Sequence, residues 1–423
     1  MTQKISVNKF PAKIIKLSNG LTVIHHYIAT TPVVVTDVWV RAGAIKEPEQ
    51  WYGIAHFLEH TIFKGTEKIG PGEFDMIIEN RGGVTNAATS HDYAHFFMTT
   101  AAQYIDDTVS ALGELLLNAM IPDQELIRER DVVLEEIRQT YDNPDWLGFQ
   151  YLLENIYQYH PYRRPVLGTE DSVMCLSADD LRNFHRYHYQ PANMTVVIVG
   201  GIKEDQAVKC VERYFKDFST PPNFCPVGKV KKEPPINEMR RQKIYLPRLE
   251  QSRLSLGWSC PGVENLRVAY GLDLLSVLLG EGRTSRLVWD LREERQLVQG
   301  ISSGFSLQKD SSLFTISVSL EQEDLPKVEE IIVNYLWDLQ KNPISEIELQ
   351  KCQRLLCNDY AFSTETPGQL ASLYGYYNTI ATADLSIIYP EQIKSFTVEE
   401  LQILANKYLS PEFYAATIMV NSV

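Results

Sequence analysis

Alternating apolar and polar positions predict several strands in the first half of the chain. Residues 21–24, 33–40 and 95–99 carry β-branched and aromatic side chains at the short spacing that strands show. Residues 105–119 and 123–140 instead repeat apolar positions every three to four residues, which predicts two long helices. Because runs of strands and runs of helices are grouped and do not strictly alternate, the pattern favours an α+β fold in which helices pack on one face of mixed β-sheets.

The second half of the chain repeats this plan. Residues 35–43 resemble residues 254–262 in sequence, at an offset of 219. Residues 121–144 align in the same way with residues 344–367, at an offset of 223. Each half therefore reads as a strand, a helix, further strands and a pair of long helices. A repeat with so long a period indicates two homologous domains, with chance similarity between two pairs of short segments as the alternative.

A stretch rich in proline and lysine separates the two copies. With 423 residues, the chain also exceeds the usual size of a single core, which predicts more than one domain. The expected division is a first domain at residues 1–218, an exposed linker at 219–236 and a homologous second domain at 237–423.

Charge and hydropathy narrow the classes of partner. The chain has 40 Lys and Arg against 54 Asp and Glu, a formal net charge of −14, whereas nucleic-acid binding requires clustered basic residues. We therefore expect no nucleic-acid partner. The negative charge suits basic peptides through long-range attraction, or simply keeps the protein soluble. No run approaches the roughly 18 apolar residues that a membrane-spanning helix needs, so no membrane span is expected.

The six cysteines indicate a reducing compartment. None belongs to a CxxC pair, so the sequence predicts free thiols and neither a disulfide framework nor a thiolate metal site. The N-terminal segment lacks the apolar stretch of a signal peptide and is poor in arginine, so neither a signal nor a transit peptide is apparent. We expect the cytoplasm or another reducing, soluble compartment; earlier removal of a targeting segment stays open.

The segment at residues 53–61 contains candidate metal ligands. It reads as a helix entered through a glycine, and four residues make just over one turn, so His56 and His60 project from the same face. Two imidazoles placed in this way can share one Zn²⁺. Glu59 lies beside them in the H-x-x-E-H order of inverted-motif zinc peptidases. The alternative is an ordinary helix with surface or capped polar side chains.

A second predicted helix offers the further carboxylate that such a site requires. Glu129 and Glu136 are seven residues apart, two turns along one face. Glu136 would complete a His, His, Glu set with a fourth position left open for water. Glu129 could orient one of these ligands without itself binding the metal. The alternative is a solvated acidic face, which the neighbouring Glu135 represents better.

Further sequence features accompany the candidate metal ligands. His60 and Glu136 are 76 residues apart, and the stretches at residues 82–89, 160–162 and 190–193 accompany them. With these features, the chain resembles the pitrilysin and insulysin family of zinc peptidases. It is most similar to the two-domain, zinc-bearing (beta) subunit type of the mitochondrial processing peptidase and its bacterial relatives. The resemblance implies two homologous domains, each a mixed sheet packed with helices, that form half of a clamshell chamber.

The resemblance also implies an activity. It implies a zinc endopeptidase that hydrolyses short or unfolded peptides, with one Zn²⁺ per chain and Glu59 as the general base. The strand from Thr89 to Thr99 is then expected to present an edge to an added substrate strand, with Asn86 and Ala87 making contacts to the peptide backbone. An ordinary interior strand is the alternative.

The second half differs from the first in its chemistry. At the offset of 219, the three motif residues fall on Leu275, Leu278 and Leu279, which predicts that this half lacks the zinc ligands. The family has an Arg and, seven residues later, a Tyr in this half that help to hold substrate. Arg292 is present, but Gln299 stands where Tyr is expected. We therefore expect a heteromer in which a homologous subunit without zinc supplies the Arg and Tyr; the alternatives are a homodimeric oligopeptidase and a non-catalytic scaffold that retains the metal site.

Overall fold

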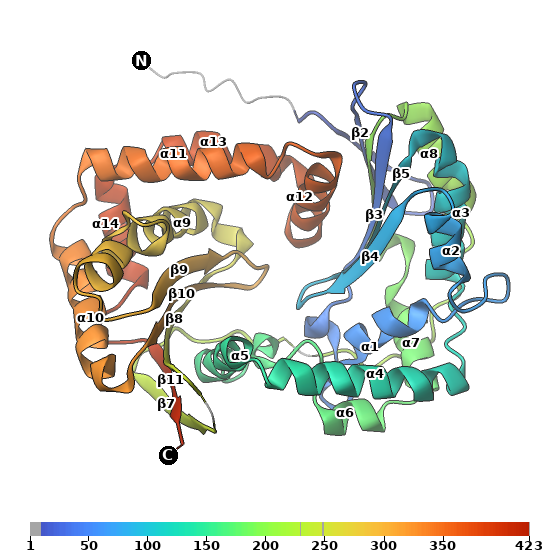
Figure 1. Cartoon of the computed structure of the whole chain (residues 1–423). Coiled ribbons are helices and arrows are strands. Elements are labelled where there is room, and N and C mark those ends of the chain that lie inside the picture. The colour runs from blue at the N-terminus through green and yellow to red at the C-terminus, as the bar shows by residue number, and fades with distance from the viewer. Residues whose placement is uncertain (1–9, 229, 248, 423) are drawn as a thin grey trace. The chain divides into compact units, whose positions relative to one another are not determined.

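A computed structural model describes residues 10–228, 230–247 and 249–422 (Figure 1). The chain forms two compact units, and each takes segments from both halves of the sequence. The first unit comprises residues 1–139, 164–230 and 363–388, and the second comprises residues 140–163, 231–362 and 389–423. One segment of each sequence half is therefore built into the other half's unit. The linker expected at residues 219–236 stays a prediction.

A six-stranded mixed sheet organises the first unit, in the order β1-β2-β6-β3-β5-β4. Its strands are β1 (Lys13–Lys16), β2 (Thr22–Tyr27), β3 (Val33–Val40), β4 (Val84–Thr89), β5 (Ala94–Ala101) and β6 (Met194–Gly200). β2 and β6 are parallel and the other neighbours are antiparallel. The strand expected to present an edge is thus interior, because β5 pairs with β3 on one side and β4 on the other. The edge strand on this side of the sheet is β4, and β1 forms the other edge.

Helices cover both faces of this sheet, whereas the sequence pattern favoured helices on one face. The helices are α1 (Ile54–Ile62), α2 (Glu73–Glu79), α3 (Ile105–Leu117), α4 (Asp123–Tyr141), α6 (Glu170–Cys175), α7 (Ala178–His188), α8 (Glu204–Tyr214) and α12 (Pro367–Ile380). The difference arises because α12 comes from the second half of the sequence. α3 and α4 confirm the two helices predicted from periodicity. Val38 and Phe96 point into the larger core, whereas Trp39 and Val197 point to the opposite face, which α12 covers.

The second unit repeats the architecture of the first. Its five-stranded sheet has the order β7-β11-β8-β10-β9. The strands are β7 (Arg240–Leu246), β8 (Ser252–Pro261), β9 (Gly300–Ser306), β10 (Ser311–Leu320) and β11 (Ala415–Asn421). The helices are α5 (Pro144–Ile156), α9 (Leu266–Gly280), α10 (Leu325–Lys341), α11 (Glu346–Phe362), α13 (Tyr389–Lys394) and α14 (Val398–Tyr408). Strand order and directions match those of β2-β6-β3-β5-β4, which confirms two homologous domains of the α+β class.

The two tryptophans that align at the offset of 219 lie on opposite faces of their sheets. Trp39 packs under α12, where a Cβ on Gly375 would lie 2.0 Å from the indole nitrogen. Trp258 instead points into the main core of the second unit, beside Phe314 and Tyr414. Since a shift of one residue turns a strand side chain to the other face, the offset matches the sequences but not the faces of the sheets.

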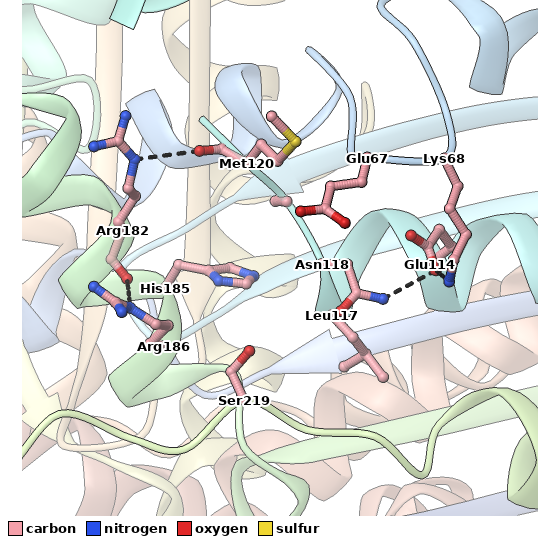
Figure 2. Close-up of a pocket in the computed structure, with 11 residues that line it drawn as sticks. Glu67, Lys68, Glu114, Leu117, Asn118, Met120, Arg182, His185, Arg186 and Ser219 are labelled. Carbon is pink, nitrogen blue, oxygen red and sulfur yellow. Dashed lines mark hydrogen bonds and ion pairs between the residues drawn. The ribbon is translucent and has the colours of Figure 1, made fainter. Parts of the chain in front are cut away.

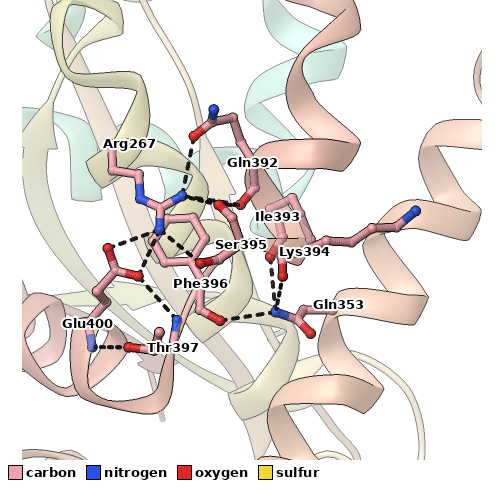
Figure 3. A network of polar contacts seen from close by, with 9 residues as sticks. All are labelled: Arg267, Gln353, Gln392, Ile393, Lys394, Ser395, Phe396, Thr397 and Glu400. Carbon is pink, nitrogen blue, oxygen red and sulfur yellow. Dashed lines mark hydrogen bonds and ion pairs between the residues drawn. The ribbon is translucent and has the colours of Figure 1, made fainter. Parts of the chain in front are cut away.

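A polar network fixes the connection between α13 and α14 in the second unit (Figure 3). Arg267 on α9 donates to both carboxylate oxygens of Glu400 at 2.9 and 2.7 Å, and its guanidinium lies 3.5 Å from the centre of the Phe396 ring. The amide of Gln353 on α11 donates to two backbone carbonyls at the end of α13 and to that of Phe396 in the connection. This short link is therefore held by two helices. Among the described residues, we find no helix whose length and apolar character would let it cross a bilayer.

Candidate metal centre

The start of α1 is fixed by a buried carboxylate. α1 begins after Gly53, which adopts a left-handed conformation (φ 84°) and leaves no room for a Cβ because the carbonyl oxygen of Leu167 would lie 2.6 Å away. Glu47 is fully buried and accepts hydrogen bonds from the backbone N–H groups of Gly53 (3.0 Å) and Ala55 (2.9 Å). It thereby satisfies two donors at the helix start that have no partner within the helix. The predicted helix entered through a glycine is confirmed.

The side chains of α1 and α4 converge on one point. The rings of His56 and His60 are 4.7 Å apart between centroids. Glu136 on α4 places one carboxylate oxygen 3.6 Å from His56 Nε2 and the other 3.3 Å from His60 Nε2. One ligand atom from each residue lies within 4.8 Å of the others, a grouping that no other His, Cys, Asp and Glu side chains form in the described part of the chain. Two imidazoles and a carboxylate are the donors of catalytic zinc sites, so these residues fit zinc.

Glu129 orients one of the imidazoles. His60 Nδ1 lies 2.9 Å from Glu129 Oε1, to which it donates, and this contact leaves Nε2 facing Glu136. The other oxygen of Glu129 is 2.6 Å from Lys64 Nζ. A carboxylate behind a ligating histidine sets both its tautomer and its ring orientation. Glu129 therefore contacts His60, and its role in orienting a metal ligand stays a prediction. Lys64 was not singled out, because nothing in the spacing of charges marks its partner.

The electrostatics of the three ligands suit a cation between them. Burial lowers the pKa of His56 to about 4, with His60 adding to the effect, so His56 is neutral. Burial also lowers the pKa of His60, but hydrogen bonds to Glu129 and Glu136 outweigh it and raise the value to about 9. The hydrogen bond from His60 lowers the pKa of Glu136. Two carboxylates thus hold a positive charge at His60, and a divalent cation would take over that role as the proton leaves.

Glu59 is placed beside the ligands and against β4. Its Oε2 accepts a hydrogen bond of 2.5 Å from the hydroxyl of Thr89, the last residue of β4. Burial raises the pKa of the Glu59 carboxyl. A carboxylate whose pKa is closer to neutrality is better suited to accept a proton and return it. The contact with Thr89 was not foreseen, because it depends on the packing of α1 against the edge strand.

The structure brings Asn86 and Ala87 to the same place. Both lie on β4, whose outer edge has no strand neighbour in the sheet, and Asn86 is exposed. A cavity of about 290 Å³ is lined by residues of α1, α4, β4 and neighbouring segments: Glu59, His60, Phe63, Lys64, Asp75, Thr85, Asn86, Ala87 and Glu129. The free strand edge therefore borders the residues that converge on the metal position.

The remaining predicted residues belong to the second unit. Arg292 lies on a π-helical turn (Val288–Glu294), where its Nε and Nη2 donate to Glu293 Oε1 at 3.0 and 2.6 Å. It is not among the residues that line the cavity at the metal centre. The side-chain amide of Gln299 donates to Glu321 at 3.0 Å. In α9 the leucines at 275, 278 and 279 are buried, and the helix carries no His, Cys or Glu.

Comparison with known proteins identifies the family. A family model described as insulinase (peptidase family M16) matches residues 22–170, and one described as the peptidase M16 inactive domain matches residues 176–356. The chain belongs to peptidase family M16. The zinc protease PqqE of Helicobacter pylori is 29% identical over 398 residues, covering 93% of this chain and 89% of that protein. The uncharacterized zinc protease YmxG of Bacillus subtilis is 28% identical over 357 residues, 84% and 85% of the two chains.

Solved structures show the same M16 fold. A protease from Helicobacter pylori has a TM-score of 0.90 and 28% identity, covering 96% of this chain and 99% of that one. A putative M16-like peptidase from Alicyclobacillus acidocaldarius has a TM-score of 0.86 and 21% identity, covering 98% and 100%. A structure titled as a peptidase M16 inactive domain, from Pseudomonas fluorescens, reaches 0.85 at 19% identity, covering 98% and 99%. Because such a chain shares the fold, an activity has to be argued from the residues of the site.

Proposed function

We propose that this M16 chain is a zinc-dependent endopeptidase that hydrolyses short or unfolded peptides. The observation that carries the proposal is the convergence of His56, His60 and Glu136 beside Glu59 and a free strand edge. Relatives named zinc proteases support the choice of metal and reaction.

Four side chains take part in zinc binding in this proposal. His56, His60 and Glu136 would hold one zinc ion per chain, and Glu129 would keep the His60 ring turned toward it. When bound, zinc supplies Lewis-acid chemistry that polarises a carbonyl oxygen and acidifies water. With two neutral imidazoles and one carboxylate as ligands, the site keeps a net positive charge of about one unit, which favours the developing oxyanion of the substrate.

Glu59 carries the proton. Its carboxylate takes the proton of the attacking water and delivers it to the leaving amine, while the hydroxyl of Thr89 holds the carboxylate in place. The peptide lies along β4 as an added strand, in contact with Asn86 and Ala87. Hydrogen bonds to the peptide backbone give affinity with little dependence on its sequence, which suits unfolded substrates.

The test is digestion of a library of unstructured peptides by zinc-loaded protein, followed by mass spectrometry. Wild type should cleave internal bonds, and Glu59→Gln should retain zinc but lose turnover by about three to six orders of magnitude. Glu135→Gln, a matched change at an exposed position of α4, should leave turnover intact. Cleavage by Glu59→Gln at a rate near that of wild type would rule out the proposed mechanism.

The proposed active form is a heteromer. Gln299 occupies the position where the family has Tyr, and its amide is already bonded to Glu321. We propose that a homologous subunit without zinc ligands supplies the Arg and Tyr. A homodimeric oligopeptidase is the second possibility, because glutamine can itself donate a hydrogen bond. A non-catalytic scaffold is the third, and the intact set of ligands weighs against it.

A further inference from the structure

One face of the second unit's sheet is built from small polar residues. Ser317 on β10 lies opposite Ser255 on β8 and opposite Ser302 on β9, so three serines form a row across three strands. In the next row, Ser319 lies between Arg253 and Gly300. The residues between them along these strands point into the core on the other face. The serines are thus the floor of a cavity of about 460 Å³.

Larger side chains form the walls of this cavity, which we call the serine-floored cavity. Arg253 and Arg292 supply guanidinium donors, each beside a carboxylate (Asp145, which also lines the cavity, and Glu293), and Phe149 and Met419 supply apolar surface. The ring of Phe149 is 42% exposed although it belongs to a helix that packs on this sheet. Gly148 lets α5 approach, since a Cβ there would lie 2.7 Å from the Met419 methyl carbon. The walls therefore combine two guanidinium groups with an accessible aromatic face.

The hydrogen-bond donors of the serine-floored cavity are not fully used. Arg253 donates from Nε to Asp145 (2.7 Å) and from Nη1 to the carbonyl of Gln251 (2.9 Å), which leaves its Nη2 without a protein partner. Arg292 uses Nε and Nη2 on Glu293, which leaves its Nη1. Among the described residues, none of the four serine hydroxyls makes a side-chain hydrogen bond.

Another cavity in the described part of the chain has a different lining. It lies in the first unit, has a volume of about 420 Å³ and is lined by charged side chains (Figure 2). Its Lys68 is bonded to Glu114 at 2.8 Å, and Arg182 donates to two backbone carbonyls and two aspartates. The imidazole of His185 is bonded to the carbonyl of Leu116. Arg186 of that cavity donates only to Arg182 O and Asn183 Oδ1, so both cavities have a spare guanidinium donor, and what distinguishes the serine-floored cavity is its row of unbonded serine hydroxyls.

We propose that the serine-floored cavity binds a carboxylate, and specifically the C-terminal carboxylate of a peptide that ends in an apolar residue. Guanidinium and hydroxyl donors match the two oxygens of a carboxylate, and Phe149 faces the place of the adjoining side chain. The choice of a peptide rests on the proposed function; acidic side chains are the other source of the same chemistry.

The test uses the full chain treated with chelator, so that no carboxylate is taken up by zinc. Binding of N-acetyl-phenylalanine and its amide is measured by ligand-observed NMR titration. Wild type should bind the acid at least about fivefold more tightly than the amide. Arg253→Gln and Ser317→Leu, which fills the floor, should abolish the difference. Arg213→Gln, an exposed arginine likewise paired with an aspartate, should keep it.

Each result decides the proposal. Equal affinity for acid and amide in wild type, or an unchanged preference in Arg253→Gln, overturns the carboxylate site. If N-acetyl-glutamate α-amide, whose only carboxylate is in the side chain, binds as tightly as N-acetyl-phenylalanine, the assignment to a peptide C-terminus is overturned. Because the titration needs neither zinc nor turnover, a chain that prefers the acid but hydrolyses nothing overturns the proposed function alone.

Discussion

His60 lies between two carboxylates, Glu136 and Glu129, to which we assign different roles. Glu136 faces its Nε2 and also reaches His56, whereas Glu129 bonds its Nδ1 and is itself held by Lys64. Removal of a ligand and removal of its support should therefore differ in degree.

We predict that Glu136→Gln loses nearly all zinc after dialysis, while Glu129→Gln binds zinc about 10 to 100 times more weakly than wild type. The reason is that a neutral amide at position 136 removes the anionic ligand, but at position 129 it only weakens the hold on the His60 ring. Zinc content and competition with a chelator measure both. Full zinc occupancy in Glu136→Gln would remove this residue from the set of ligands.

A buried carboxyl in the second unit makes stability depend on pH. Burial raises the pKa of Asp273 from 3.8 to about 6, with Glu281 and Asp359 adding to the shift, while the hydroxyl of Tyr389 donates to it. The pKa of Asp273 is thus higher in the folded chain than in the unfolded chain. Asp273 therefore contributes its whole stabilisation below about pH 4, and this stabilisation is lost as the pH rises through 6.

We expect Asp273→Asn to remove this loss. The variant should match wild type near pH 4 and exceed it above pH 6 by up to about 3 kcal/mol in the free energy of unfolding, since each pKa unit corresponds to about 1.4 kcal/mol. Urea unfolding between pH 4 and 8, followed by circular dichroism, measures the difference. A difference that does not change with pH would contradict the assignment to Asp273.

Sequence spacing found the residues of the candidate metal centre that share a helix face. His56 with His60, and Glu129 with Glu136, are related by whole turns, and helical geometry fixes such pairs within one element. Lys64 and Thr89 were missed, because their contacts with Glu129 and Glu59 arise only when different elements pack together. Residue type and spacing thus identify candidate ligands, but not the groups that hold them in place.

At the scale of elements, alternation identified strands without giving their neighbours. β5 has the expected pattern, but its place between β3 and β4 makes it interior, and β4 takes the edge. The repeat was visible in the sequence, yet Trp39 and Trp258 face opposite ways. Strand pairing and register depend on contacts between segments that are distant in sequence. The alternation of apolar and polar residues within one strand does not predict these contacts.

The start of α1 gives a prediction at this scale. Glu47→Ala leaves the N–H groups of Gly53 and Ala55 unsatisfied in a fully buried place, and each costs about 1–3 kcal/mol. We expect faster hydrogen exchange along α1 and weaker zinc binding, although Glu47 touches neither histidine. Glu49→Ala, at an exposed position nearby, is the control. Unchanged exchange and zinc affinity in Glu47→Ala would show that the carboxylate does not hold the helix.

At the scale of the whole molecule, the proposed heteromer predicts how activity depends on a partner. Zinc-loaded protein alone should cleave peptides weakly, and addition of a homologous subunit that carries the Arg and Tyr should raise the rate by about tenfold or more, since these groups stabilise the oxyanion. Peptide turnover with and without the partner measures this. Strong hydrolysis by the lone chain, unchanged by Gln299→Tyr, would favour the homodimer.

The exchange of segments between the two units has a consequence for protein synthesis. When the ribosome has translated residue 230, the first unit still lacks α12, and the sheet face with Trp39 and Val197 is bare. At about 5–20 residues per second, residue 388 follows on the order of 10 to 30 s later. The sheet of the second unit is completed later still, because β11 lies between β7 and β8 and is translated last. The nascent chain therefore presents an apolar sheet surface that a ribosome-associated chaperone would have to cover.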